Sequence, residues 1–456
     1  MNLETTMSSS LSDPRQGTQA ITKSKPPVNP RRAVLAGALG NLIEYYDYAT
    51  YGILAVTLAP LFFPSNQPGV SILSALAVFG AAFVMRPLGG WFFGRLGDRT
   101  GRRRALILTV VTIGLASGAV GVLPTHAEAG TLAPVLLVLL RLIQGFSAGG
   151  EFAGSTTYIV ETAPAKKRGL YLSAGALTIV GGNAVAATVV GLTASTMTAA
   201  QMASWGWRIP FLLSLPLALF GLWARLRLSE SSEFEDMVER REIQRSPLLN
   251  VFKNHFGALV QVLCIGIAQA GFGFIGLIFL SVYLIGTRGF DQGSVYWLAA
   301  IAIAVGAVLC PLSGLLVDRF GGKVVLVSVN AAFVVLAWPM FYLLSGTTSF
   351  VLVGVVYVVF MILFGFYNPP TLFVASQLFP IPVRYTGIAM GINVSTVLAG
   401  ATGPLTAQWL VHATGDLKAP AWWVIGVSLI GLIGALTLRQ ARSSAAAVTG
   451  VRPQEA

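Results

Sequence analysis

Charged side chains inside apolar stretches are the residues of this sequence best suited to chemistry. Glu44 and Asp47 lie three positions apart in one apolar run, so a helix would place them on one face. Arg141 and Gln144 have the same spacing in a later run. A charge at membrane depth costs at least about 2.5–3.5 kcal/mol on insertion scales, so we treat these groups as functional candidates.

The mixture of acids and a guanidinium suits the handling of protons. Proton coupling needs a group that is neutral in one state and charged in another, and no histidine lies in the middle of an apolar run. We therefore expect Glu44, Asp47 and Arg141 to carry proton coupling. Two neighbouring carboxylates discourage each other's ionisation, whereas a nearby Arg141 would favour it. Withdrawal of Arg141, or a substrate anion competing for it, would therefore switch the protonation of the acids. The alternative is a fixed ion pair that never titrates.

Candidate substrate contacts extend beyond this set. Arg86 is open between a packing pair and an anion contact, and Glu151 between a pair with loop cations and a functional acid. The second half has almost no charge inside its apolar runs, so its candidates are neutral, although a Tyr in a membrane helix more often packs. The expected substrate contacts are Arg141, Gln144, Arg86, Tyr45, Tyr48, Gln269, Tyr367, Asn368 and Asn393.

The composition indicates the elements that position these residues. The 456 residues are 55% hydrophobic and 11% charged, with a mean hydropathy of +0.73, whereas soluble proteins carry about 25% charged residues. The net charge of +12 lies in short loops, where it would meet anionic lipid headgroups rather than nucleic acid. Cys264 and Cys310 lie inside apolar runs, and no His/Cys cluster predicts a metal or a cofactor.

About 20 apolar residues cross a bilayer as a helix. We therefore predict an all-α polytopic membrane protein with twelve transmembrane helices. The fifth run is rich in Ala, Gly and Thr, and the tenth is interrupted by Asn368-Pro369-Pro370. The twelve runs are 33–60, 71–94, 105–123, 132–158, 170–194, 208–227, 257–285, 294–317, 324–345, 349–373, 386–411 and 421–438.

The distribution of Lys and Arg predicts the orientation. All of the 30 except Arg86, Arg141, Arg208, Arg288 and Lys418 lie in the tails and alternate loops, which places both termini in the cytoplasm of a plasma membrane. The expected parts are a disordered N-terminal tail, an N-terminal six-helix bundle, a cytoplasmic connector, a C-terminal six-helix bundle and a C-terminal tail, at 1–32, 33–228, 229–255, 256–440 and 441–456.

A loop that occurs twice divides the chain into similar halves. Its copies are Gly94-Arg95-Leu96-Gly97-Asp98-Arg99-Thr100-Gly101-Arg102-Arg103-Arg104 and Gly314-Leu315-Leu316-Val317-Asp318-Arg319-Phe320-Gly321-Gly322-Lys323. Each copy lies between two apolar runs, which predicts two pseudo-symmetric halves that move against each other. The expected gating residues are Gly94, Asp98, Arg99, Gly101, Arg102, Asp318 and Arg319.

The first copy resembles the signature loop of the major facilitator superfamily. The resemblance implies that Asp98 clamps the loop to the other half when the cytoplasmic side is closed. The second copy departs from the pattern at Gly322, where an Arg is common, which leaves its role less defined.

Further stretches resemble the metabolite:proton symporter family, whose members carry citrate, α-ketoglutarate, shikimate or proline and betaine. They are Gly40-Asn41-Leu42-Ile43-Glu44-Tyr45-Tyr46-Asp47-Tyr48, Arg86-Pro87-Leu88-Gly89-Gly90, Arg141-Leu142-Ile143-Gln144-Gly145-Phe146-Ser147-Ala148-Gly149-Gly150-Glu151 and Trp205-Gly206-Trp207-Arg208-Ile209-Pro210-Phe211. The resemblance covers about 33–440, and it implies that the first-span acids and the fourth-span Arg match motif positions of the family.

The leading hypothesis is a monomeric, proton-driven importer of a small organic acid, a secondary active transporter in a bacterial inner membrane. The alternative is proton symport of a zwitterionic osmolyte such as proline or betaine. The short tail Ala441–Ala456 lowers that alternative, because osmosensing members carry a C-terminal coiled coil. A drug:proton antiporter is disfavoured because the fifth run lacks the Gly-Pro of that class. A membrane enzyme is disfavoured because the sequence contains no nucleotide-binding loop.

Overall fold

The structure, a computed structural model, describes residues 30–100, 102–149, 156, 159–160, 163–226 and 247–438. These residues are helical apart from short connections. The elements are α1 (Pro30–Ile53), α2 (Ala55–Phe62), α3 (Pro68–Val84), α4 (Arg86–Thr100), α5 (Arg102–Gly121), α6 (His126–Ala129), α7 (Leu132–Ala148), η1 (Ala165–Lys167), α9 (Arg168–Thr196), α10 (Ala199–Gln201), η2 (Met202–Gly206), α11 (Arg208–Leu212), α12 (Ser214–Leu226), α14 (Pro247–Asn254), α15 (Phe256–Phe274), η3 (Ile275–Phe279), α16 (Leu280–Val282), η4 (Tyr283–Thr287), α17 (Gln292–Phe320), α18 (Gly322–Gly346), α19 (Phe350–Leu378), α20 (Ile381–Ser395), η5 (Thr396–Gly400), α21 (Gly403–Thr414) and α22 (Pro420–Thr437).

Each of the twelve predicted apolar runs coincides with a helix or with consecutive helices. Nine helices in the described part of the chain are long and apolar enough to cross a membrane, and Ile107–Gly121 and Leu132–Ala148 are shorter apolar helices. The first run, which carries Glu44 and Asp47, is not among these nine. It begins at Pro30, earlier than the predicted start at 33.

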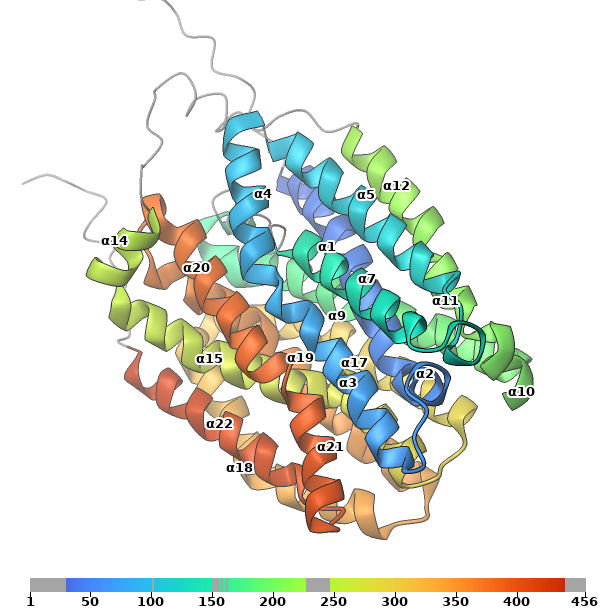
Figure 1. Ribbon diagram of the computed structural model, residues 1–456. Coiled ribbons are helices and arrows are strands. Elements are labelled where there is room, and N and C mark those ends of the chain that lie inside the picture. Colours follow the sequence, from blue (N-terminus) through green and yellow to red (C-terminus); the bar gives the residue numbers. More distant parts are fainter. Residues whose placement is uncertain are drawn as a thin grey trace, which may run out of the picture.

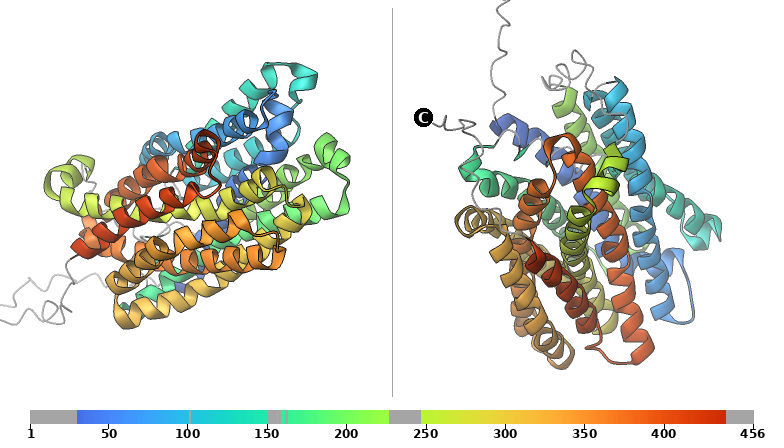
Figure 2. Two further views of the ribbon diagram at one scale, coloured as in Figure 1. Left: turned by 90° about the horizontal axis from the view of Figure 1, so that it is seen from below. Right: turned by 90° about the vertical axis from the view of Figure 1, so that its left-hand side faces the viewer.

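The helices form two bundles that lie side by side (Figure 1). One bundle contains α1, α4, α5, α7 and α12, and the other contains α15, α18, α20 and α22. The helices run in broadly similar directions (Figure 2). The most extensive contact between the bundles joins α9 to α17, and α3 packs against α21 in a second contact. The interior that these helices enclose contains the buried charges.

Several predicted spans are broken within the bundles rather than straight. The first span turns at Leu54 between α1 and α2, and the second turns at Met85 between α3 and α4. Three π-helical segments interrupt later spans, η3 and η4 in the seventh and η5 in the eleventh. Such wide turns occur frequently at functional sites.

The tenth span is not interrupted where the sequence suggested it would be. α19 continues through Pro369 and Pro370, although each proline removes a backbone donor. The carbonyls left over are those of Gly365 and Phe366, four positions earlier. The side chain of Cys310 donates to the Gly365 oxygen at 3.6 Å, and Ser313 donates to the Phe366 oxygen at 2.7 Å. Side chains of the neighbouring α17 therefore satisfy the freed carbonyls, as membrane helices require.

The connector between the bundles contains one described helix. α14 lies against α15 and α20 (Figure 1). It buries Val251 and exposes Leu248, Leu249 and Phe252, so it has the character of a helix at the membrane surface. The rest of the predicted connector, 229–246, lies outside the described residues, as do the predicted tails apart from the start of α1.

Candidate functional site

Two buried ion pairs link α1 to its neighbours in the first bundle. Glu44 of α1 pairs with Arg86, whose Nη2 donates to the Glu44 carboxylate. Arg86 is the first residue of α4, directly after the turn at Met85. Both side chains are buried. The pair therefore fixes the bent second span to the first span.

The second pair is looser and belongs to a larger network. Arg141 Nη1 lies 3.6 Å from Asp47 Oδ2. The other oxygen, Asp47 Oδ1, accepts hydrogen bonds from the Ser117 hydroxyl and from Gln144 Nε2, the latter at 3.0 Å. Arg141 Nη1 also donates to Gln144 Oε1 at 3.0 Å. Asp47 is thus held by three side chains from α5 and α7, each of which donates to it or faces it.

Arg141 has unused hydrogen-bonding capacity. Its side chain is fully buried, yet Nε and Nη2 have no hydrogen-bond acceptor among the described residues. Its guanidinium lies over the rings of Tyr51, at 4.4 Å, and Tyr48, at 5.3 Å. Leaving a buried charged donor unsatisfied is costly, so these two nitrogens mark a place where a small anion would be stabilised.

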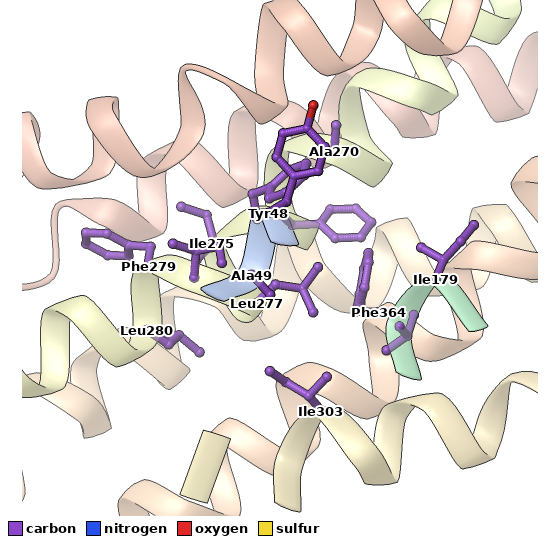
Figure 3. Packing of buried hydrophobic residues seen from close by; sticks show 14 of the residues in the cluster. Tyr48, Ala49, Ile179, Ala270, Ile275, Leu277, Phe279, Leu280, Ile303 and Phe364 are labelled. Atoms are coloured by element: carbon purple, nitrogen blue, oxygen red, sulfur yellow. The ribbon is translucent and has the colours of Figure 1, made fainter. Parts of the chain in front are cut away.

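Tyr48 is the aromatic side chain between the two ion pairs. Its ring lies 5.3 Å from the Arg141 guanidinium and 5.5 Å from that of Arg86. The Tyr48 hydroxyl is buried without a hydrogen-bond partner among the described residues. Figure 3 shows this side chain extending from α1 toward Ala270 of α15, in the other bundle. Tyr45, one turn earlier, is half-buried, and Gly182 of α9 lies beside its Cβ.

The candidate residues of the second bundle fall into separate places. Gln269 Nε2 donates to Asn368 Oδ1 at 2.6 Å, and Asn368 Nδ2 is buried without a partner among the described residues. The Tyr367 hydroxyl instead donates to the Ile265 carbonyl and accepts from Asn330, so it is occupied within its own bundle. Asn393 faces α4, because a Cβ at Gly90 would lie 3.9 Å from its amide nitrogen.

The second copy of the repeated loop joins the two bundles. Asp318 accepts hydrogen bonds from the backbone N–H groups of Gly169, at 2.7 Å, and Leu170, at 3.0 Å. These N–H groups lie in the first turn of α9, where a negative charge is favoured. Arg319 lies over Phe320. In the first copy, Gly101 and the side chains of Asp98, Arg99 and Arg102 lie outside the described part, as do Glu151 and the surroundings of Gly94.

Several residues at this site did not emerge from the sequence. Ser117 stands in an apolar run with nothing in its spacing to distinguish it from packing residues. Tyr51 is one of four tyrosines near the start of the chain, and the sequence does not say which face each one occupies. Asn330, which donates to the Tyr367 hydroxyl in the second bundle, could have been recognised as a polar candidate, because it is a lone amide inside an apolar run.

Comparison with known proteins gives the same architecture. Residues 37–400 match the profile of the Major Facilitator Superfamily. The chain is 34% identical to the proline/betaine transporter of Salmonella typhimurium over 90% of its length and 83% of the relative. It is 33% identical to the ectoine/proline transporter of Corynebacterium glutamicum, over 91% of this chain and 85% of the relative.

A third relative, the shikimate transporter of Escherichia coli, is 32% identical over 94% of this chain and 98% of its own length. The crystal structure of a D-xylose-proton symporter superposes with a TM-score of 0.70 at 20% identity, over 89% of this chain and 96% of that one. This likeness shows the fold. The protein is a multi-pass membrane transporter and not an enzyme, and it belongs to the major facilitator superfamily, within the metabolite:proton symporter family.

Proposed function

We propose that this protein imports a zwitterionic osmolyte of the proline or betaine kind together with a proton. The observation that carries the proposal is Arg141, with two buried, unpartnered nitrogens beside the carboxylate of Asp47. A substrate carboxylate would satisfy those nitrogens. The relatives named for proline, betaine and ectoine favour this alternative over the broader organic-acid hypothesis.

Asp47 carries the proton in this mechanism. While Asp47 is ionised, it holds Arg141 by charge and accepts hydrogen bonds from Ser117 and Gln144. Protonation removes the negative charge, and Arg141 is then free to bind a substrate carboxylate. When the substrate leaves, Arg141 again favours ionised Asp47, which releases the proton. Substrate and proton therefore occupy the site together.

The Glu44–Arg86 pair remains closed during this cycle. Its direct contact and burial make separation costly, because each partner would be left as an uncompensated buried charge. It contributes no net charge to the site. With Asp47 protonated, the site then carries the single positive charge of Arg141, which matches one carboxylate.

Import of shikimate or a similar monocarboxylate is the second candidate. The cationic site and the relative named for shikimate favour it. Charge distinguishes the candidates: a zwitterion with one proton carries a positive charge inward, whereas a monocarboxylate with one proton is neutral. We place both termini in the cytoplasm, in line with the Lys and Arg distribution, and expect the protein to act as a monomer in the bacterial inner membrane.

Uptake into proteoliposomes tests the proposal. Radiolabelled proline, glycine betaine, ectoine, shikimate and citrate are supplied with an acid-outside pH gradient, with or without an inside-negative potential. We expect the zwitterions to accumulate, the potential to stimulate their uptake, and a protonophore to abolish it. Accumulation driven by a sodium gradient would overturn proton coupling. Accumulation of shikimate alone, unaffected by the potential, would establish the second candidate.

A further inference from the structure

Phe274 occupies a position where the two bundles meet beside the charged site. It is the last residue of α15 and is buried. Its ring makes edge contacts with Phe79, at 5.7 Å, and Phe83, at 5.1 Å, both on α3 of the other bundle. Phe79 and Phe83 also contact each other at 5.3 Å. We call these three rings the phenylalanine cluster.

The phenylalanine cluster adjoins both guanidinium groups. Arg141 lies 6.0 Å from the Phe79 ring centre, and Arg86 lies 5.7 Å from that of Phe83. Tyr48 stacks on Phe83 at 4.7 Å. The aromatic faces therefore already lie within cation–π range of positive groups. A substrate whose carboxylate binds Arg141 would bring its other end to these rings.

The backbone around Phe274 departs from regular α-helix in two places. The π-helical segment η3 begins at the next residue. Gly400, the last residue of the π-helical segment η5, lies against the same ring, since a Cβ at Gly400 would come within 2.8 Å of it. Two wide turns and a glycine thus surround one phenylalanine of the second bundle. Wide turns of this kind occur frequently at functional sites.

We infer that Phe274 is a specificity-determining residue that binds the onium end of the substrate from the second bundle. This inference rests on the proposed zwitterion transport and assigns the end of the substrate that Arg141 does not bind. A quaternary ammonium has no N–H to donate, so aromatic faces are its natural partners. Because Phe274 touches the two rings of α3 edge to edge in this structure, the onium group would enter only when Phe274 moves away from them, which links substrate occupancy to the contact between the bundles.

Substrates with different onium groups separate this role from simple packing. The secondary ammonium of proline can donate hydrogen bonds, whereas the trimethylammonium of glycine betaine cannot. We expect Phe274→Leu to raise the KM for glycine betaine about tenfold and the KM for proline less than about threefold, with similar kcat values. Phe274→Tyr keeps an aromatic face and should restore the betaine KM.

Phe272→Leu is the matched control. Phe272 lies on the same helix and stacks on Phe333 at 4.2 Å within its own bundle, so its replacement should leave the ratio of the two KM values unchanged. Because a ratio is independent of the amount of folded protein, loss of stability does not hide the result. An equal change for both substrates, or no change, would overturn the role of Phe274. Wild-type protein that concentrates neither substrate would instead overturn the proposed function.

Discussion

At the scale of single residues, the two buried acids of α1 differ in how they are held. Glu44 has a guanidinium in direct contact, whereas Asp47 accepts hydrogen bonds from an amide and a hydroxyl and lies 3.6 Å from its guanidinium. A carboxylate that gains and loses a proton needs partners that tolerate both forms. Ser117 can accept as well as donate, which suits Asp47 to that role and leaves Glu44 as the fixed partner of Arg86.

Replacing Asp47 tests the proton carrier directly. Asp47→Asn mimics the protonated form, so we expect uphill uptake to be lost while exchange of labelled for unlabelled substrate continues. Both are measured in the same proteoliposomes, and Glu128→Gln, at an exposed acid of the short helix α6, should behave as wild type. Energised accumulation at the normal rate in Asp47→Asn would rule out the coupling role.

Replacing Glu44 tests the fixed pair. Glu44→Gln leaves the buried Arg86 charge without its counter-ion, which should destabilise the protein by about 3–5 kcal/mol. We expect a lower melting temperature in detergent, and partial recovery in the double variant Glu44→Gln, Arg86→Met. The double variant should retain proton-driven uptake. If it melts like the wild type but no longer couples uptake to protons, Glu44 is itself a coupling acid.

At the scale of elements, hydropathy was sufficient to locate the helices but not their breaks. Each apolar run coincides with helical structure because lipid offers the backbone no other hydrogen-bond partners. The turn at Leu54 and the π-helical segments η3 and η5 have no local residue pattern that marks them. Asn368-Pro369-Pro370 predicted a break that the structure does not have, because the donors that satisfy the freed carbonyls lie on another helix.

The compensation across α17 and α19 can be measured. Ser313→Ala removes the donor to the Phe366 carbonyl, and an unsatisfied buried carbonyl costs about 1–3 kcal/mol. We expect a lower melting temperature with the fold retained. Ser345→Ala is the control, since Ser345 makes a comparable bond at an exposed helix end and its loss should be nearly neutral. Equal melting temperatures for both variants would contradict the account of the proline pair.

Some residues of the site could be recognised from the sequence, whereas the role of others depends on contacts that only the structure shows. Glu44, Asp47 and Arg141 stand out because a charge in an apolar run is expensive. Tyr367 was a reasonable candidate from its polarity, yet the structure gives its hydroxyl two partners within its own bundle. Phe274 is apolar and therefore could not be recognised from the sequence. Its proposed role depends on its contacts with α3 of the other bundle.

At the scale of the whole molecule, hydrogen bonds join the two bundles at both ends of α17. At one end, Asp318 accepts from the first turn of α9. Near the other end, Gln292 donates to Thr57 of α2 at 2.6 Å, and Trp297 donates to Ser195 of α9 at 3.2 Å. Alternating access would require these two sets of contacts to separate in turn.

Weakening one end should favour opening there. Asp318→Asn removes the charge that faces the α9 N-terminus, so we expect the cytoplasmic side to open more often. The reporter is Ser173→Cys, because Ser173 lies against Gly314 across the bundle contact. Its labelling by a membrane-impermeant maleimide in inside-out vesicles should accelerate severalfold. Asp416→Asn, at an exposed acid near Lys418, should not change the rate, and unchanged labelling in Asp318→Asn would contradict the role assigned to the Asp318 contact.

The buried pairs of α1 also constrain how the chain is made. The partners of Glu44 and Asp47 lie on later helices, and Gln144 follows Asp47 by 97 positions. At about 5–20 residues per second, the ribosome needs roughly 5–20 s to supply that partner. During this interval α1 carries unpaired acids and is poorly suited to lipid, so we expect the insertion machinery to retain it until α7 emerges. Among the described residues of the second bundle no charged side chain is buried, so its helices can enter the bilayer one at a time.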